Sequence, residues 1–161
     1  MDGKKITRRH FVKVSGAAAG AIAIGGAGLS GCASKKYPVV PMKDETLVID
    51  LKAHAKLREV GEGMLFQVPN NLENIVVIHT KDGYVATGAQ CPHEGCSVRW
   101  KKDKELLVCP CHKSAFKADG TCVRGPGWKN PPSCEKWGKS LTRYDAALEG
   151  DAVLVTGSKD D

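Results

Sequence analysis

Three features are missing or scarce in this sequence of 161 residues, and each absence excludes a class of protein. No long amphipathic helical pattern is present, which argues against a helical fold and leaves short strand-like runs as the main structural signal. Excess positive charge is scarce beyond residue 32, where 19 Lys/Arg face 17 Asp/Glu, so a nucleic-acid-binding protein is not expected. The C-x-x-C-H motif is also absent, which excludes a covalently attached haem of the c type.

The N-terminal segment has the organisation of an export signal. Arg8 and Arg9 precede an uncharged run over residues 14–34 that is rich in alanine and glycine, and this resembles a twin-arginine signal. That export route carries proteins that have already folded around a cofactor. An ordinary secretory signal or a transmembrane helix is the alternative, although six glycines and only four larger aliphatic residues make residues 14–34 a weak spanning helix.

The end of this run resembles a bacterial lipobox. Leu29-Ser30-Gly31 precedes Cys32, which predicts cleavage before Cys32 and lipidation of that residue, so that residues 1–32 form a signal with its lipobox. An uncleaved signal helix is the alternative. Residues 33–44 contain Lys, Ser and two prolines without hydrophobic periodicity, which favours a tether, although an arm packed along the domain would have the same composition.

Two short loops hold the residues with clear metal chemistry. The first runs from Cys91 to Cys96 and contains His93; the second runs from Cys109 to Phe116 and contains His112. Together they give C-x-H, fifteen residues, and C-x-x-H, which supplies two thiolates and two imidazoles. This ligand set suits a 2Fe-2S centre with mixed ligands, and it also suits tetrahedral zinc, but a zinc site has no use for two further cysteines beside its ligands.

The ligand types carry a consequence for redox chemistry. Two ferric ions, two sulfides and four thiolates leave two negative charges, whereas replacing two thiolates by neutral imidazoles leaves none. Adding an electron is then less opposed, and the reduction potential rises.

The two loops resemble those of the Rieske proteins of quinol-oxidising cytochrome bc complexes and their relatives, and the resemblance extends roughly over residues 45–155. By that resemblance Cys91, His93, Cys109 and His112 bind a 2Fe-2S cluster. The remaining loop cysteines, Cys96 and Cys111, fall on the disulfide that joins the loops in the family, and such a bond requires an oxidising compartment.

Some positions depart from the quinol-oxidising pattern. Ser114 matches the serine that donates a hydrogen bond to a bridging sulfide in the family, but Phe116 stands where high-potential members have a tyrosine that donates to a ligand sulfur. The loss of that donor predicts a lower potential. Lys113 replaces a family glycine, and Glu94 stands at a loop tip that is apolar in members that dock into cytochrome b.

Short strand-like runs surround the loops and predict the fold. We expect an all-β protein over residues 45–157, an antiparallel sandwich or barrel with a small inserted cluster-binding subdomain. The expected strands are 46–51, 64–68, 75–80, 84–89, 98–100, 106–108, 141–148 and 152–155.

The segment after the second loop contains two further cysteines. Gly125-Pro126 resembles the start of the proline loop that covers the cluster in the family, but the segment is longer here. With the other cysteines assigned, Cys122 and Cys134 are the remaining pair, and we predict a second disulfide that holds this loop. Two buried free thiols are the alternative.

The predicted protein is thus a one-electron carrier on the outer face of a bacterial membrane, held there by a lipid anchor. Its expected partner is a membrane-embedded or periplasmic redox protein: a cytochrome b or c of a bc-type complex, with quinol as a possible donor, or the molybdenum subunit of an exported enzyme similar to arsenite oxidase. A component of a ring-hydroxylating oxygenase is a third possibility. It is disfavoured by the signal and by Cys96 and Cys111, since those components are cytoplasmic and lack the loop disulfide.

Overall fold

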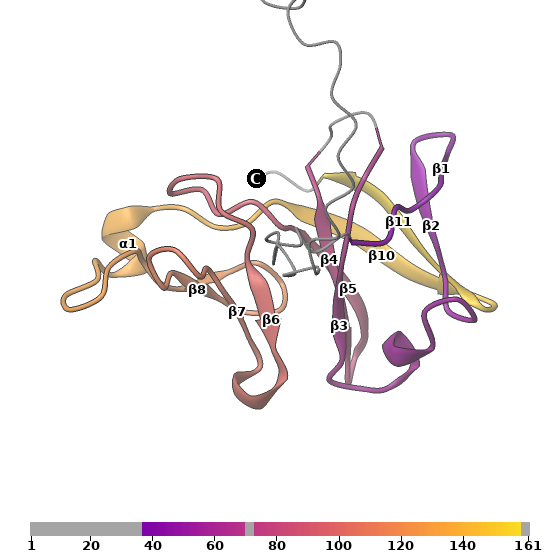
Figure 1. Cartoon of the computed structure of the whole chain (residues 1–161), viewed down its shortest axis with the longest axis horizontal. Coiled ribbons are helices and arrows are strands. Elements are labelled where there is room, and N and C mark those ends of the chain that lie inside the picture. Colours follow the sequence, from indigo (N-terminus) through magenta and orange to yellow (C-terminus); the bar gives the residue numbers. More distant parts are fainter. Residues whose placement is uncertain (1–36, 70–72, 159–161) are drawn as a thin grey trace, which may run out of the picture. The chain divides into compact units, whose positions relative to one another are not determined.

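The computed structural model describes residues 37–69 and 73–158, which form two antiparallel sheets (Figure 1). The larger sheet has seven strands in the order β1-β2-β11-β10-β5-β4-β3, and the smaller has four in the order β6-β7-β8-β9. The strands of the larger sheet are β1 Met42–Lys43, β2 Thr46–Asp50, β3 Gly63–Phe66, β4 Ile75–Thr80, β5 Gly83–Gly88, β10 Arg143–Glu149 and β11 Ala152–Ser158. Those of the smaller sheet are β6 Arg99–Lys101, β7 Leu106–Val108, β8 Ala115–Phe116 and β9 Cys122–Arg124.

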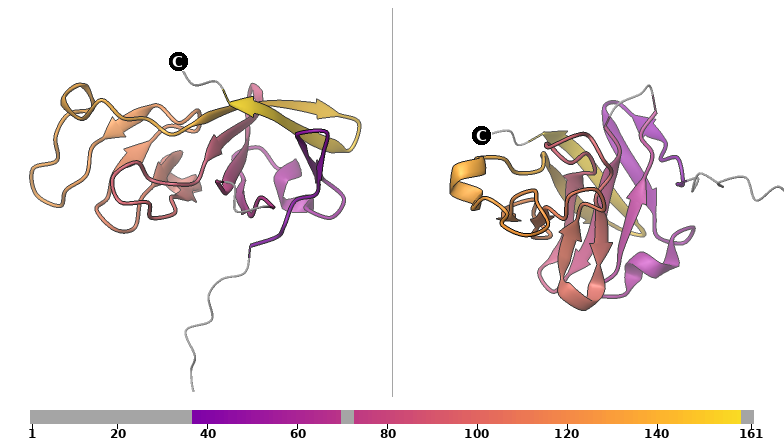
Figure 2. Two further views of the ribbon diagram at one scale, coloured as in Figure 1. Left: turned by 90° about the horizontal axis from the view of Figure 1, so that it is seen from above. Right: turned by 60° about the vertical axis from the view of Figure 1, so that its left-hand side comes forward.

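The small sheet is an insertion in the large one. Strands β5 and β10 are hydrogen-bonded neighbours, with Thr87 opposite Arg143, yet β6 to β9 and the short helix α1 (Cys134–Trp137) lie between them in the sequence. The views in Figure 2 show this inserted lobe beside the large sheet, with β1 at the far end from α1. The predicted all-β fold with an inserted subdomain is therefore confirmed.

Strand β4 joins the two parts of the hydrophobic core. Its side chains alternate between faces, as they must in a strand. Ile75 and Val77 pack with Leu57, Phe66 and Val153, whereas Val76 and Ile78 pack with the core of the inserted lobe. A strand with both faces buried reads as a continuous apolar run, and this explains why the bounds predicted for β4 were correct.

The last part of the predicted tether packs against the domain. Val40 is buried with the main core, its backbone N–H donates to the carbonyl of Gln67 at 3.1 Å, and β1 pairs with β2. Residues 37–43 are therefore better described by the alternative interpretation, an arm along the domain. The signal, Cys32 and residues 33–36 lie outside the described ranges. Within those ranges no helix is long and apolar enough to cross a membrane.

Candidate metal centre

The two metal-binding loops follow strand ends and share one backbone design. In each loop the N–H of the first cysteine donates to the carbonyl five residues later, and the N–H four residues later donates back to the carbonyl of that cysteine. The bonds of the first loop are Cys91 to Cys96 at 2.9 Å and Gly95 to Cys91 at 2.9 Å. Those of the second loop are Cys109 to Ser114 at 2.9 Å and Lys113 to Cys109 at 3.1 Å. The repeated pattern gives the two loops matching turns.

The shared design requires a left-handed residue at the same place in each loop. Gly95 has φ of 73° and Lys113 has φ of 60°. Glycine adopts this conformation freely, whereas a lysine is strained there by about 1 kcal/mol. The loop geometry thus explains why the resemblance expects glycine at Lys113.

Two free thiols lie at the base of the loops. Cys91 and Cys109 are 1% and 2% exposed, and among the described residues they are the cysteines outside disulfides. Burial raises the pKa of the Cys91 thiol, the backbone N–H of His93 opposes this shift, and the neighbouring Cys109 adds to it. Two buried thiols that face each other are suitable ligands for a metal, because coordination removes their protons.

Two imidazoles lie at the surface end of the same loops. The Nδ1 atoms of His93 and His112 are 3.2 Å apart and the ring planes are inclined at 89°. His93 is exposed, and the His112 side chain is 37% exposed. Nitrogens bound at about 2.0–2.1 Å to one tetrahedral ion lie about 3.3 Å apart, so these two atoms are placed to share an ion.

A disulfide ties the two loops together. Cys96 and Cys111 are bonded with a Cα–Cα distance of 6.5 Å, as the resemblance implied. The Cys109 sulfur lies within 4.8 Å of both bridged sulfurs, so the bond passes close to the thiol site. A bridged pair cannot supply thiolates, which leaves Cys91 and Cys109 as thiolate donors in this part of the chain.

The environment of the Ser114 hydroxyl shows whether an iron–sulfur cluster is compatible with this site. Ser114 is fully buried and its Oγ has no hydrogen-bond partner, although the side chain is close enough to Cys91 to help lower the pKa of that thiol. A buried unpaired donor is unfavourable by about 1–3 kcal/mol unless something absent from the protein part accepts from it. A sulfide is such an acceptor, whereas a lone zinc ion is not. The donor set of two thiols, two imidazoles and this hydroxyl fits a 2Fe-2S cluster.

Glu94 is a member of the site that sequence reasoning did not assign. Its Oε2 lies 3.5 Å from Nδ1 of His112, and His93, Glu94 and His112 form one group of potential ligands. The sequence shows Glu94 only as a departure from the family pattern at a loop tip. Its contact crosses between the two loops, and no local spacing signals such a contact.

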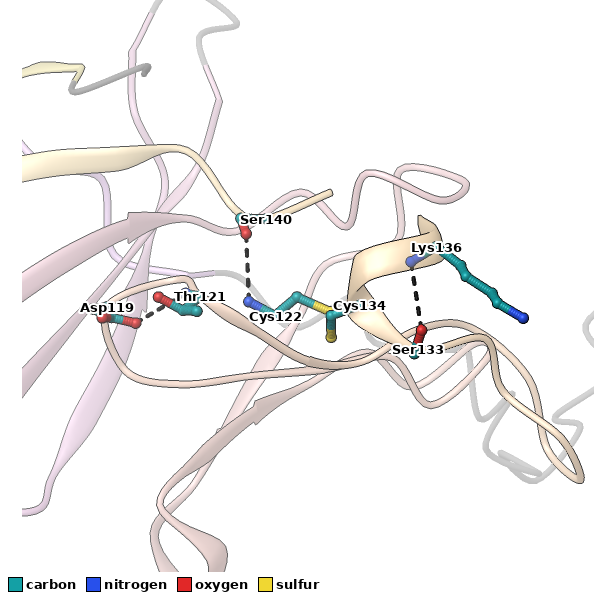
Figure 3. The surroundings of a disulfide bond; sticks show 7 residues. All are labelled: Asp119, Thr121, Cys122, Ser133, Cys134, Lys136 and Ser140. Atoms are coloured by element: carbon teal, nitrogen blue, oxygen red, sulfur yellow. Dashed lines mark hydrogen bonds between the residues drawn. A yellow bond between two sulfur atoms is a disulfide. The ribbon is translucent and has the colours of Figure 1, made fainter. Parts of the chain in front are cut away.

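The second predicted disulfide is also present. Cys122 on β9 is bonded to Cys134 at the start of α1, and the Cys122 N–H lies 3.4 Å from Ser140 Oγ (Figure 3). Ser133 caps α1, accepting from the Lys136 N–H at 3.5 Å (Figure 3). This bond closes the segment that contains Gly125, where a Cβ atom would lie 2.7 Å from the carbonyl oxygen of Pro132. Only glycine allows that approach.

The segment after β9 also contacts the loop that contains His112. The Gly127 N–H donates to the His112 carbonyl at 2.8 Å, and the Arg124 guanidinium donates to the Gly127 carbonyl at 2.8 Å. The extended segment after β9 therefore covers one side of the site, as the resemblance predicted for residues from Gly125 onward.

Comparisons with known proteins agree with this geometry. The family profile described as the Rieske [2Fe-2S] domain matches residues 51–144. The cytochrome b6-f complex iron-sulfur subunit of Chlorobaculum tepidum is 29% identical over 109 residues, 64% of this chain and 59% of that protein. Subunit 1 of the same kind from Nostoc sp. is 32% identical over 99 residues, 60% of this chain and 50% of that protein. The chain thus spans between half and three fifths of the length of these curated relatives.

Two solved structures are similar to this chain. The plasma membrane Rieske protein of Synechocystis is 27% identical, with a TM-score of 0.45 and coverage of 66% of this chain and 91% of that one. A complex of carbazole 1,9a-dioxygenase oxygenase and ferredoxin is 16% identical, with a TM-score of 0.56 and coverage of 74% and 30%. At that identity the second likeness concerns the fold alone.

Proposed function

Because the chain belongs to the Rieske [2Fe-2S] domain family, we propose that it carries single electrons as the iron–sulfur subunit of a quinol-oxidising complex of the cytochrome bc type. The observation that carries the proposal is the pair of surface imidazoles, with Nδ1 atoms 3.2 Å apart, above two buried free thiols. The iron–sulfur subunits of cytochrome b6-f complexes among its relatives support the class of complex.

Each group of the site has a role in this proposal. The buried Cys91 and Cys109 would hold one iron of the cluster, and His93 and His112 at the surface would hold the other. The cluster supplies the one-electron chemistry when bound. The Ser114 hydroxyl would donate a hydrogen bond to the cluster, and the Cys96–Cys111 bond keeps the loops at a fixed separation.

The redox partner is a membrane-embedded or periplasmic protein, with a cytochrome b or c favoured by the relatives. The exposed imidazoles are the groups that a quinol or a partner cofactor would meet. A second candidate, the small subunit of an exported molybdenum enzyme similar to arsenite oxidase, is favoured by Glu94, whose carboxylate beside His112 makes the loop tip polar.

For the N-terminal part we propose export followed by lipid anchoring. Arg8 and Arg9 provide the twin-arginine signal, and lipidated Cys32 holds the domain at the outer face of the membrane. Residues 33–36 would then link the lipidated Cys32 to the arm that packs on the domain. Arg8→Lys with Arg9→Lys should block export, and mass spectrometry of the membrane-bound protein should find Cys32 as an acylated N-terminus.

The test of the central proposal is spectroscopy combined with chemical analysis of the purified protein. We expect two irons and two acid-labile sulfides per chain, and an electron paramagnetic resonance spectrum of the reduced protein with g-values typical of mixed His/Cys ligation. Zinc in place of iron, or g-values of an all-cysteine ferredoxin, would refute the assignment.

A further inference from the structure

The segment between β9 and α1, residues 125–133, covers one side of the candidate metal centre and is called the covering loop here. It exposes a tryptophan. Trp128 is 65% exposed, more than any other large hydrophobic side chain that the described residues expose. Exposed aromatic side chains are unfavourable in water, and they are enriched among the residues that anchor protein–protein interfaces. Whether the fold holds Trp128 in this exposed position depends on the contacts of its loop.

The loop that holds Trp128 is fixed on both sides. Gly127, its neighbour, donates to the His112 carbonyl at 2.8 Å and accepts from Arg124 at 2.8 Å. The Cys122–Cys134 disulfide closes the whole segment. These contacts hold the loop of Trp128 in place. One of them is with the loop that contains His112.

Lys113 contacts the exposed indole. Its Nζ lies 4.7 Å from the centroid of the Trp128 ring, in the geometry of a cation–π interaction. The same lysine occupies the strained left-handed position with φ of 60°. The pair places a positive charge and an aromatic surface next to His112. A glycine at position 113 could not make this contact.

Two more lysines lie in the same lobe, and one of them contacts the first loop. Lys139 donates from Nζ to the Pro92 carbonyl at 3.2 Å, which brings its charge onto the first loop. Lys129 is exposed beside Trp128 and has no ion pair within the described parts of the chain. Glu94, an acid on the first loop, lies against His112. Lys113, Lys129 and Lys139 thus add positive charge around Trp128 and the first loop.

The whole inserted lobe shares this sign of charge. Residues 89–140 contain ten Lys/Arg and five Asp/Glu. The other described residues contain six Lys/Arg and ten Asp/Glu. The charge is thus divided between the two ends of the domain, and such a division orients a protein as it approaches a charged partner.

We propose that Trp128 with Lys113, Lys129 and Lys139 forms a docking surface for a redox protein that carries acidic side chains around its own cofactor. This rests on the proposed function, because it assumes that one electron passes between that cofactor and the iron held by His93 and His112. The acidic rim would pair with the lysines, and an apolar patch beside it would cover Trp128.

The test uses two forms of one redox protein with opposite surface charge. Reduced holoprotein is mixed in a stopped-flow instrument with ferric cytochrome c, either native and basic or fully succinylated and acidic, and one electron reduces each haem. At low ionic strength we expect the succinylated form to react about tenfold faster than the native form, and we expect the difference to vanish at high salt.

Variants separate this surface from general charge effects. Lys113→Glu with Lys129→Glu should abolish the preference for the succinylated form. Trp128→Ser should slow the reaction with the succinylated form at every ionic strength while its salt dependence stays the same. The control is Lys43→Glu on β1, an exposed lysine at the opposite end of the domain, which should leave the preference unchanged (Figures 1 and 2).

The outcomes distinguish this inference from the proposed function. A protein without the mixed-ligand 2Fe-2S spectrum would overturn both. A normal spectrum with equal rates for the two cytochromes, or with a faster native form, would overturn only the docking surface. Flotation with phosphatidylglycerol vesicles that is lost in the Lys113→Glu, Lys129→Glu variant, together with equal cytochrome rates, would assign the surface to a lipid membrane instead.

Discussion

The rings of Phe116 and Trp137 pack together in the inserted lobe, with centroids 5.9 Å apart and planes inclined at 43°. Phe116 is fully buried in the same apolar cluster as Cys91 and Cys109. It stands where the resemblance places a tyrosine, so the hydroxyl that such a tyrosine would direct toward a candidate ligand sulfur is missing here.

Replacing Phe116 by Tyr should restore that hydroxyl and raise the midpoint potential. A hydrogen bond to a ligand sulfur stabilises the electron-rich reduced form. A net contribution of about 1 kcal/mol corresponds to about 40 mV for one electron. Protein-film voltammetry measures the shift, and an unchanged potential with an intact cluster would mean that the new hydroxyl does not reach the sulfurs.

Ser114→Ala should change the potential in the opposite direction. Removing the buried Oγ deletes a donor toward the cluster, so we expect a fall of about 40 mV or more by the same conversion. Thr87→Val is the matched control, because Thr87 Oγ1 is also buried without a partner but belongs to β5 in the large sheet. Equal shifts in the two variants would contradict a specific role of Ser114.

The sequence could predict those features of the fold that repeat locally. The apolar run of β4 and the short runs of β7 and β11 depend on alternation and burial, and their starting residues agree with the structure. Strands β8 and β9 and helix α1 were not predicted. They have two to four residues each, and they are stabilised by the disulfide and by pairing with neighbours rather than by their own periodicity.

The candidate site was predicted in its residues but not in its contacts. The four candidate ligands and the Cys96–Cys111 pair came from motif spacing and family resemblance, and the Cys122–Cys134 pair came from elimination. The structure brings the members of each pair together. The approach of Glu94 to His112 and of Lys113 to Trp128 was missed. Both contacts arise between segments that become neighbours only after the loops have folded, so no local pattern records them.

The two disulfides should differ in their effect on the cluster. Cys96→Ser with Cys111→Ser removes the bond that passes beside Cys109, so we expect the cluster to be lost much faster on dilution or mild heating. Cys122→Ser with Cys134→Ser should lower the free energy of unfolding by about 2–4 kcal/mol while the spectrum stays that of the wild type. Following the visible absorption of the cluster over time, beside denaturant unfolding, separates the two effects.

A reversed result would be informative. If the Cys122–Cys134 variant lost its cluster as quickly as the other, the covering loop would be needed to retain the metal. The loop would then contribute more than the hydrogen bond between Gly127 and His112 suggests.

The last prediction concerns acid and the ion pairs of Glu62. This carboxylate is 12% exposed and lies 2.6 Å from Lys102 Nζ and 3.0 Å from Lys56 Nζ, so it connects the β6–β7 hairpin to the turn before β3. Hydrogen bonds from Lys102 and then Lys56 lower the pKa of Glu62 from its ordinary value of 4.5. A carboxyl with a lowered pKa stabilises the folded state above its ordinary pKa, and this stabilisation is lost as the pH falls through the lowered value.

Glu62→Gln should therefore reduce the free energy of unfolding at pH 7 by about 0.5–1 kcal/mol, a modest amount because both lysines are more than half exposed. The difference from the wild type should shrink as the pH falls below about 4.5, since the wild-type carboxyl then becomes protonated and neutral like the amide. Denaturant titrations of both proteins across this range provide the measurement. The control is Glu149→Gln, at an exposed position on β10. A difference that stayed constant with pH would show that the two ion pairs do not contribute to stability.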